Sequence, residues 1–148
     1  MLSLCLVATL LAAAHPEPAT QTPVEHVYAR PSGTQLKVHV FSPDSAGGKR
    51  RSAIVLFHGG GWAMGEPAWA FPRALHFTER GMVAIAAQYR LSDQKEITPL
   101  EAMADARAAI RCVRAHADSL GVDPKRVVAY GWSAGGHLAA CGAIFDTS

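Results

Sequence analysis

The sequence has 148 residues, which is enough for one domain with a hydrophobic core but fewer than large α/β enzymes usually contain. Of these residues, 49% are hydrophobic and the formal net charge is +2. This composition argues against disorder and against a broadly basic surface for nucleic acid, so partners have to be inferred from individual sites.

The chain opens with an apolar segment. Residues 2–14 are almost entirely apolar and end in three alanines, a pattern typical of a secretory signal, although no Lys or Arg precedes them. The segment is too short to span a bilayer. We expect a signal peptide at residues 1–14 and export to the periplasm or the medium; without this signal the protein would be cytoplasmic. Residues 15–23 contain three prolines and are expected to form an extended leader.

The first regular structure is expected to be a β-hairpin. Two segments of alternating apolar and polar residues, 24–28 and 36–41, flank the turn sequence Pro31-Ser32-Gly33. Alternation predicts one covered and one exposed face, so both strands should be half exposed. The basic residues 49–51 in the following turn are interpreted as a solvated loop rather than a binding patch.

Two buried parallel strands are predicted next. Residues 53–57 form a continuous apolar run of the kind that is covered on both faces, and this run leads directly into the glycine-rich sequence 58–62. A helix from about residue 68 to 79 separates it from a second apolar run at residues 82–87. Strand, helix and strand in this order predict a parallel crossover.

The clearest helix begins at Thr98, with Pro99 at its first position and Glu101 completing a capping box. An apolar stripe at helical spacing should face the sheet: Met103, Ala106, Ile110, Val113 and Ala117. We expect Gly121 to close this helix and Asp123-Pro124 to turn the chain into the next strand.

A G-x-S-x-G motif follows that strand. Residues 126–130 are rich in β-branched side chains, the motif occupies residues 131–136, and the small-residue run 137–143 should be helical. Strand, sharp turn and helix form the setting of a nucleophile elbow, in which Ser133 is the candidate nucleophile and the N–H of Ala134 points at a developing oxyanion.

The glycine run at residues 59–61 offers further backbone N–H groups on a chain that can approach a ligand closely. Both glycine motifs follow the carboxyl ends of predicted parallel strands, which is the edge where open α/β sheets bind ligands. We therefore expect the two motifs to form one site.

Taken together, His58-Gly59-Gly60-Gly61-Trp62 and Gly131-Trp132-Ser133-Ala134-Gly135-Gly136 resemble motifs of the α/β-hydrolase superfamily. Specifically, the chain resembles the hormone-sensitive-lipase-like and acetyl-xylan-esterase-like carboxylesterases, from about Ser52 to the end. Tyr89-Arg90-Leu91 and Asp105 share in this similarity. The resemblance implies an α/β fold in which an antiparallel hairpin is followed by parallel strands with flanking helices.

The resemblance also implies roles for individual residues. Ser133 would be the nucleophile of an acyl-enzyme mechanism. The oxyanion hole would consist of backbone N–H groups: those of Gly60, Gly61 and Ala134. Gly59 would be a further contributor, His58 would hold the shape of its loop rather than act as a base, and Asp105 would be structural.

The activity that the resemblance implies is hydrolysis of carboxylic esters with a small or medium acyl group, an acetylated plant polysaccharide being one expected substrate. A peptidase or a lactone hydrolase of the same fold is the nearest alternative, and a non-catalytic binding module is an alternative from another class. We expect no metal and no cofactor, because the sequence has no cluster of ligands and its glycine motif lacks a phosphate-loop lysine.

The triad is incomplete in this sequence. In the resembling family the acid and the histidine follow the nucleophile, whereas only residues 145–148 follow the predicted elbow helix. The other histidines are interpreted as ordinary surface or core residues, the first two on edge strands: His26, His39, His76, His116 and His137. Asp146 is interpreted as a helix-end residue.

We therefore expect residues 24–148 to be the N-terminal half of an α/β-hydrolase domain, without its acid, its histidine and the rest of the sheet. Its elbow strand should then have an unpaired edge that favours self-association. Cys112 and Cys141 lie in predicted helices and are interpreted as buried apolar residues, with pairing left open.

Overall fold

The structure is a computed structural model that describes residues 21–44, 48–92 and 97–144. The expected signal peptide lies outside the described residues, as do Asp146 and most of the expected leader. No helix in the described part of the chain is long and apolar enough to cross a membrane.

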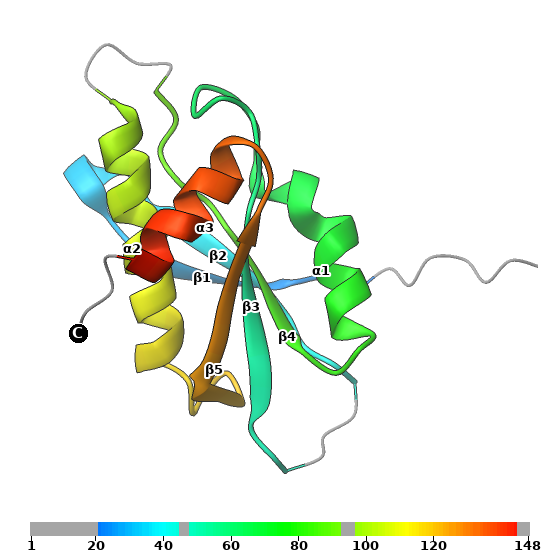
Figure 1. The fold of residues 1–148 in the computed structure, drawn as a ribbon. Helices are drawn as coiled ribbons and strands as arrows, with labels where there is room; N and C mark the ends of the chain where they lie inside the picture. The colour runs from blue at the N-terminus through cyan, green and yellow to red at the C-terminus, as the bar shows by residue number, and fades with distance from the viewer. Residues whose placement is uncertain (1–20, 45–47, 93–96, 145–148) are drawn as a thin grey trace, which may run out of the picture.

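A five-stranded sheet forms the centre of the fold, with the strand order β1-β2-β4-β3-β5 (Figure 1). Its strands are β1 (Val24–Ala29), β2 (Leu36–Phe41), β3 (Arg51–Phe57), β4 (Val83–Ala87) and β5 (Val122–Gly131). β2 pairs antiparallel with β1 and β4, whereas β3 pairs parallel with β4 and β5. This confirms the expected hairpin followed by parallel strands.

The hairpin differs from the expectation in one respect. β1 and β2 pair around a short 3₁₀ turn at Pro31–Gly33, as predicted. β2, however, is mostly buried rather than half exposed, and its buried residues are Leu36, Val38, Val40 and Phe41. The reason is that β2 lies between β1 and β4, so that helices cover both of its faces. The prediction that His39 lies on an edge strand was wrong for the same reason.

The helices cover both faces of the sheet. A 3₁₀ turn at Pro67–Ala70 precedes α1 (Phe71–Thr78), which lies on one face, and α2 (Pro99–Ala115) and α3 (Ala134–Ile144) lie on the other (Figure 1). Two hydrophobic clusters result, one between the sheet and α2 and α3, and one beneath α1. Burial of these apolar side chains is the main stabilising contribution to such a fold.

α2 begins as predicted and ends earlier than predicted. Its capping box is present, since the Thr98 hydroxyl accepts from Leu100 N–H and the Glu101 carboxylate accepts from Thr98 N–H. The helix ends at Ala115, six positions before the expected glycine. The N–H of Val122 donates to the carbonyl of Ala117 (2.8 Å), and this bond turns the chain directly into β5.

The expected turn at Asp123-Pro124 lies inside β5, where the register with β3 shifts between Arg51 and Ala53.

The two cysteines of the helices are unpaired: Cys141 is buried as expected, while Cys112 is only half buried.

Candidate active site

The elbow has the geometry that its sequence predicts. β5 ends at Gly131, α3 begins at Ala134, and Ser133 lies between them with φ of +54°. This left-handed conformation is costly for a residue with a side chain and is kept only where the surroundings impose it. A Cβ on Gly131 would overlap the backbone of Gly135, so that the turn requires a glycine there. The Ser133 side chain is exposed at the tip of this turn.

In the first turn of α3, one N–H group has no acceptor among the described residues. Gly136 N–H and His137 N–H donate to the carbonyl of Ser133 (2.9 and 3.2 Å), and Gly135 N–H donates to that of Trp132 (3.0 Å). The N–H of Ala134 donates to none of the described residues. A free N–H at the positive end of a helix dipole is suited to stabilise negative charge.

The glycine loop offers two more such donors. Gly60 and Gly61 both have positive φ (125° and 60°), and a Cβ on Gly60 would overlap the carbonyl of Met64. Ala63 and Met64 donate their N–H groups to the carbonyl of Gly60 (both 3.1 Å), which closes a tight turn. Within the described part of the chain, the N–H groups of Gly60 and Gly61 have no acceptor.

The loop and the elbow are in direct contact. Phe57 and Gly131, the last residues of β3 and β5, are partners in the sheet. A Cβ on Gly59 would lie 2.8 Å from Nε1 and 3.1 Å from the carbonyl oxygen of Trp132, the residue before the serine. The rings of Trp62 and His137 also meet, edge to face, at 5.3 Å. The structure therefore brings both predicted motifs together at one edge of the sheet.

His58 supports the loop from inside. It is almost fully buried, and its ring stacks on that of Tyr89 with centroids 4.4 Å apart. Burial lowers its pKa below the usual value, so the ring is neutral near pH 7. In the neutral tautomer that fits this site, Nδ1–H donates to the carbonyl of Gly59 (2.7 Å). Nδ1 of this ring is thus engaged by the backbone of its own loop.

Among the described residues, the hydroxyl of Ser133 makes no hydrogen bond to a base. The helical histidines have partners elsewhere: His137 Nε2 lies 3.6 Å from the thiol of Cys141, and the ring of His116 bonds to the carbonyl of Cys112. Among the described residues there is also no group of three or more His, Cys, Asp or Glu that could hold a metal ion.

Sequence reasoning missed two supports of the glycine loop. A Cβ on Gly65 (φ +107°) would lie 2.5 Å from Nδ1 of His58, so that a glycine is needed at this position, where the chain passes the His58 ring. The segment after β4, beginning at Tyr89, also bonds to the loop; the family resemblance included Tyr89-Arg90-Leu91 but gave these residues no role in holding the loop. Asp105 is structural, as expected: it is buried, and it accepts from Nε and Nη2 of Arg90 (both 2.8 Å).

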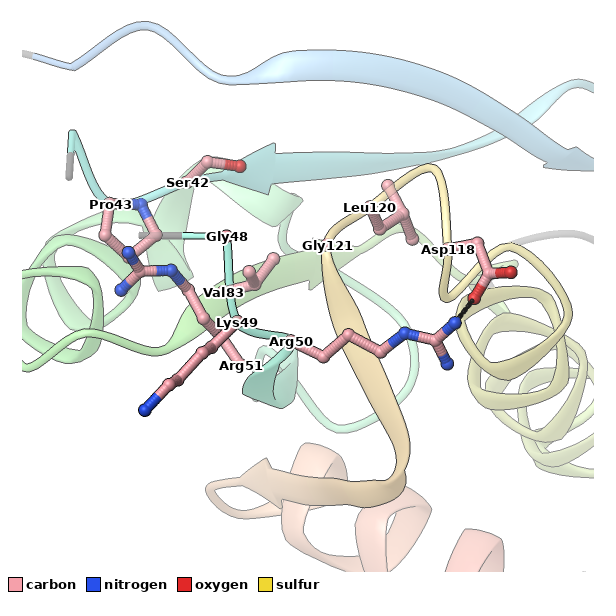
Figure 2. Close-up of a pocket in the computed structure, with 10 residues that line it drawn as sticks. All are labelled: Ser42, Pro43, Gly48, Lys49, Arg50, Arg51, Val83, Asp118, Leu120 and Gly121. Carbon is pink, nitrogen blue, oxygen red and sulfur yellow. Dashed lines mark ion pairs between the residues drawn. The ribbon is translucent and has the colours of Figure 1, made fainter. Parts of the chain in front are cut away.

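A hollow of about 480 Å³ lies at the opposite end of the strands (Figure 2). The basic residues 49–51 line it, but Arg50 pairs with Asp118 (2.7 Å) and the guanidinium of Arg51 donates to the carbonyl of Gly81 (3.3 Å). It is formed around the start of β3, whereas the two glycine motifs follow the strand ends. The candidate site is therefore the elbow edge. Lys49 and Arg50 are exposed, as the interpretation of a solvated loop expects, but Arg51 is the first residue of β3 and is only partly exposed.

Comparison with known proteins agrees with this geometry. The BD-FAE family model matches residues 38–148. A solved thermophilic esterase from Thermogutta terrifontis is 48% identical with a TM-score of 0.77, over 81% of this chain and 43% of that chain. An isoprenylcysteine α-carbonyl methylesterase of Arabidopsis thaliana is 32% identical over 62% of this chain and 21% of that protein. A probable carboxylic ester hydrolase of Mycobacterium tuberculosis is 35% identical over 63% of this chain and 22% of that protein. The chain thus spans less than half the length of these relatives.

Proposed function

The chain belongs to the BD-FAE family of α/β-hydrolases, and we propose that it is the nucleophile-bearing part of a serine carboxylesterase. One observation carries this proposal: Ser133 stands in a left-handed elbow, against a loop in which two N–H groups have no acceptor among the described residues. These groups and the free N–H of Ala134 are donors of the type that an ester's developing oxyanion requires.

In the proposed reaction, Oγ of Ser133 attacks the ester carbonyl and forms a C–O bond as its proton passes to a base. The negative oxygen of the tetrahedral intermediate accepts hydrogen bonds from the N–H groups of Gly60, Gly61 and Ala134. The intermediate collapses, the alcohol leaves with a proton, and water then hydrolyses the acyl-enzyme. We propose that polypeptide outside the described residues supplies the base and its acid, because no described residue bonds to the Ser133 hydroxyl.

We propose esters of small acyl groups as substrates. The Thermogutta terrifontis esterase has been solved with propionate and with butyrate bound, and it shares almost half of its aligned residues with this chain. An acetylated polysaccharide is also an ester of a small acyl group and is therefore included in this proposal. A peptidase or lactone hydrolase is distinguished by substrate: we expect turnover of p-nitrophenyl acetate by the complete protein and none of a matching anilide.

A fluorophosphonate probe tests the role of Ser133, since the related esterase has been solved in a form phosphonylated by cyclosarin. We expect one adduct per chain, on Ser133, and none in the Ser133→Ala variant. Labelling of the 148-residue chain should be slow, because residual catalysis without a base relies on the oxyanion hole and binding. Mass spectrometry of the labelled peptide provides the measurement.

The matched control is Ser119→Ala, which removes an exposed hydroxyl that donates to the carbonyl of His116 and leaves the elbow intact. This variant should be labelled like the unmodified chain. If the folded protein takes up no probe, the second candidate function is favoured: a non-catalytic binding module. The observation that keeps this candidate open is that the hydroxyl of Ser133 has no hydrogen-bond partner among the described residues.

We further propose that the 148-residue chain self-associates through β5. Within the described sheet β5 pairs only with β3, and Val128 on this strand is 51% exposed because α1 packs on β4 instead. An unpaired strand edge with exposed apolar side chains favours pairing with a second copy. We expect Val128→Lys to shift the chain toward monomer on a sizing column. The same change at Val24, which is 60% exposed on the opposite edge, should leave association unaltered. A monodisperse unmodified monomer would contradict the proposal.

A further inference from the structure

The segment from Tyr89 to Ser92, directly after β4, bonds to both ends of the glycine loop. At the first end, the Tyr89 hydroxyl donates to the carbonyl of His58 (2.9 Å), and its ring stacks on the imidazole. At the other end, the carbonyl of Trp62 accepts from the N–H and from the hydroxyl of Ser92 (2.7 and 3.1 Å). The five loop residues 58–62 are thus held at their two terminal carbonyls.

This segment is itself anchored to α2. The backbone N–H and Nε of Arg90 both donate to Oδ2 of Asp105 (3.0 and 2.8 Å), and Nη2 donates to Oδ1 (2.8 Å). Asp105 is buried in the middle of α2, whose first turn has a complete capping box. The segment that holds the loop is therefore itself fixed to α2, a helix that packs against the sheet.

The loop needs such external support. Gly60 and Gly61 adopt positive φ, and glycine has more backbone freedom than any other residue, so these residues do not fix their own N–H directions. Trp62 also has a positive φ (62°), which is rare for a bulky residue and persists only where the surroundings over-determine it. The two hydrogen bonds from Ser92 and the ring contact with His137 supply that constraint.

We propose that Tyr89 and Ser92 are positioning residues, which set the directions of the Gly60 and Gly61 N–H groups relative to Ser133 by holding the loop at both ends. They act through the loop and do not touch the substrate. The proposal rests on the oxyanion role of these two glycines. Donors of this kind have to be placed within about 0.5 Å of the productive geometry, so a loosely held loop would lose much of its effect.

Backbone ¹⁵N relaxation of the folded chain tests this without requiring activity. In the double variant Tyr89→Phe/Ser92→Ala, we expect the order parameters of Gly60 and Gly61 to fall from about 0.85 toward 0.6 or below. The amides of β3 and β5 should keep their values. If the order parameters and amide shifts of the loop stay unchanged in the double variant, the positioning role is excluded.

Tyr28→Phe is the matched control. It also removes a largely buried tyrosine hydroxyl, one that donates to the carbonyl of Gln88 (2.6 Å), next to the segment but not to the loop. If Tyr89 had a merely structural role, Tyr28→Phe and Tyr89→Phe would both lower the unfolding midpoint, and neither would change the order parameters or shifts of the loop amides. The positioning role predicts that only Tyr89→Phe changes the amides of Gly60 and Gly61.

The rate of fluorophosphonate labelling gives a second readout. Removing one oxyanion donor typically costs about a hundredfold or more, so displacing two donors should slow labelling of Ser133 by at least about tenfold. Tyr28→Phe should label at the unmodified rate. If the unmodified chain is not labelled at all, the proposed esterase function fails, while the relaxation experiment still decides whether these residues hold the loop.

Discussion

Replacing Gly135 with alanine is expected to lower the free energy of unfolding by about 3 kcal/mol, near the upper end for overpacked cores. A Cβ at this position would overlap the carbonyl oxygen of Phe57 and would lie 2.5 Å from that of His58. Both obstacles are backbone atoms at the end of β3, so no change of rotamer relieves them. The first turn of α3 would have to move away from the sheet, and Ser133 with it.

Gly136→Ala is the matched control in the same helix. Its Cβ would lie 3.4 Å from the nearest atom, the carbonyl oxygen of Gly131, which is an ordinary contact. Alanine is a better helix former than glycine, so this variant should gain about 0.5–1 kcal/mol. Urea unfolding followed by circular dichroism measures both changes. Equal effects of the two substitutions would show that the close approach of α3 to β3 is not as described.

Replacing Asp105 with alanine is expected to cost about 3 kcal/mol, at the lower end for a broken buried ion pair. The side chains of Arg90 and Asp105 are only 18% and 5% exposed, so the guanidinium would lose its partner in a place with little access to water. The loss should be partly recovered in the double variant Arg90→Met/Asp105→Ala, because an apolar pair leaves no uncompensated charge. Chemical unfolding of the single and double variants makes this comparison.

Asp123→Ala provides the control for this pair. Asp123 also bonds to an arginine, since its Oδ2 lies 2.9 Å from Nε of Arg126, but this pair is exposed to solvent. Exposed ion pairs contribute little, because water screens the charges. Asp123→Ala should therefore lower the free energy of unfolding far less than Asp105→Ala does. A comparable loss of stability at both positions would contradict the distinction between buried and exposed pairs.

The parts of the fold and site that could be predicted from the sequence are those with local patterns. The apolar run before His58 marked a strand covered on both faces, and the capping box at Thr98 located the start of α2. The elbow was predictable because a tight turn around Ser133 leaves room only for small residues on either side. The meeting of the two glycine motifs followed from their place after parallel strands.

The parts that escaped prediction depend on distant partners. The alternation of β2 suggested an exposed face, but pairing with β4, far along the chain, places this strand inside the sheet. The bonds from Tyr89 and Ser92 end on backbone carbonyls, which carry no sequence pattern of their own. The end of α2 was also missed, since its last residue is Ala115, and Gly121, with a positive φ, instead closes the turns that follow it through the bond from Val122 N–H to the carbonyl of Ala117.

The pairing of Phe57 with Gly131 restricts where the chain can change in length. Each residue advances a strand by about 3.3 Å and reverses the face of every side chain beyond it. One residue gained or lost inside β3 or β5 would therefore shift the glycine loop by about 3.3 Å relative to the elbow. This shift is longer than a hydrogen bond, so the N–H groups of the loop would no longer face the same oxyanion as that of Ala134. Connections at the amino-terminal ends of these strands face no such restriction, so we expect insertions to be tolerated there and not near the serine.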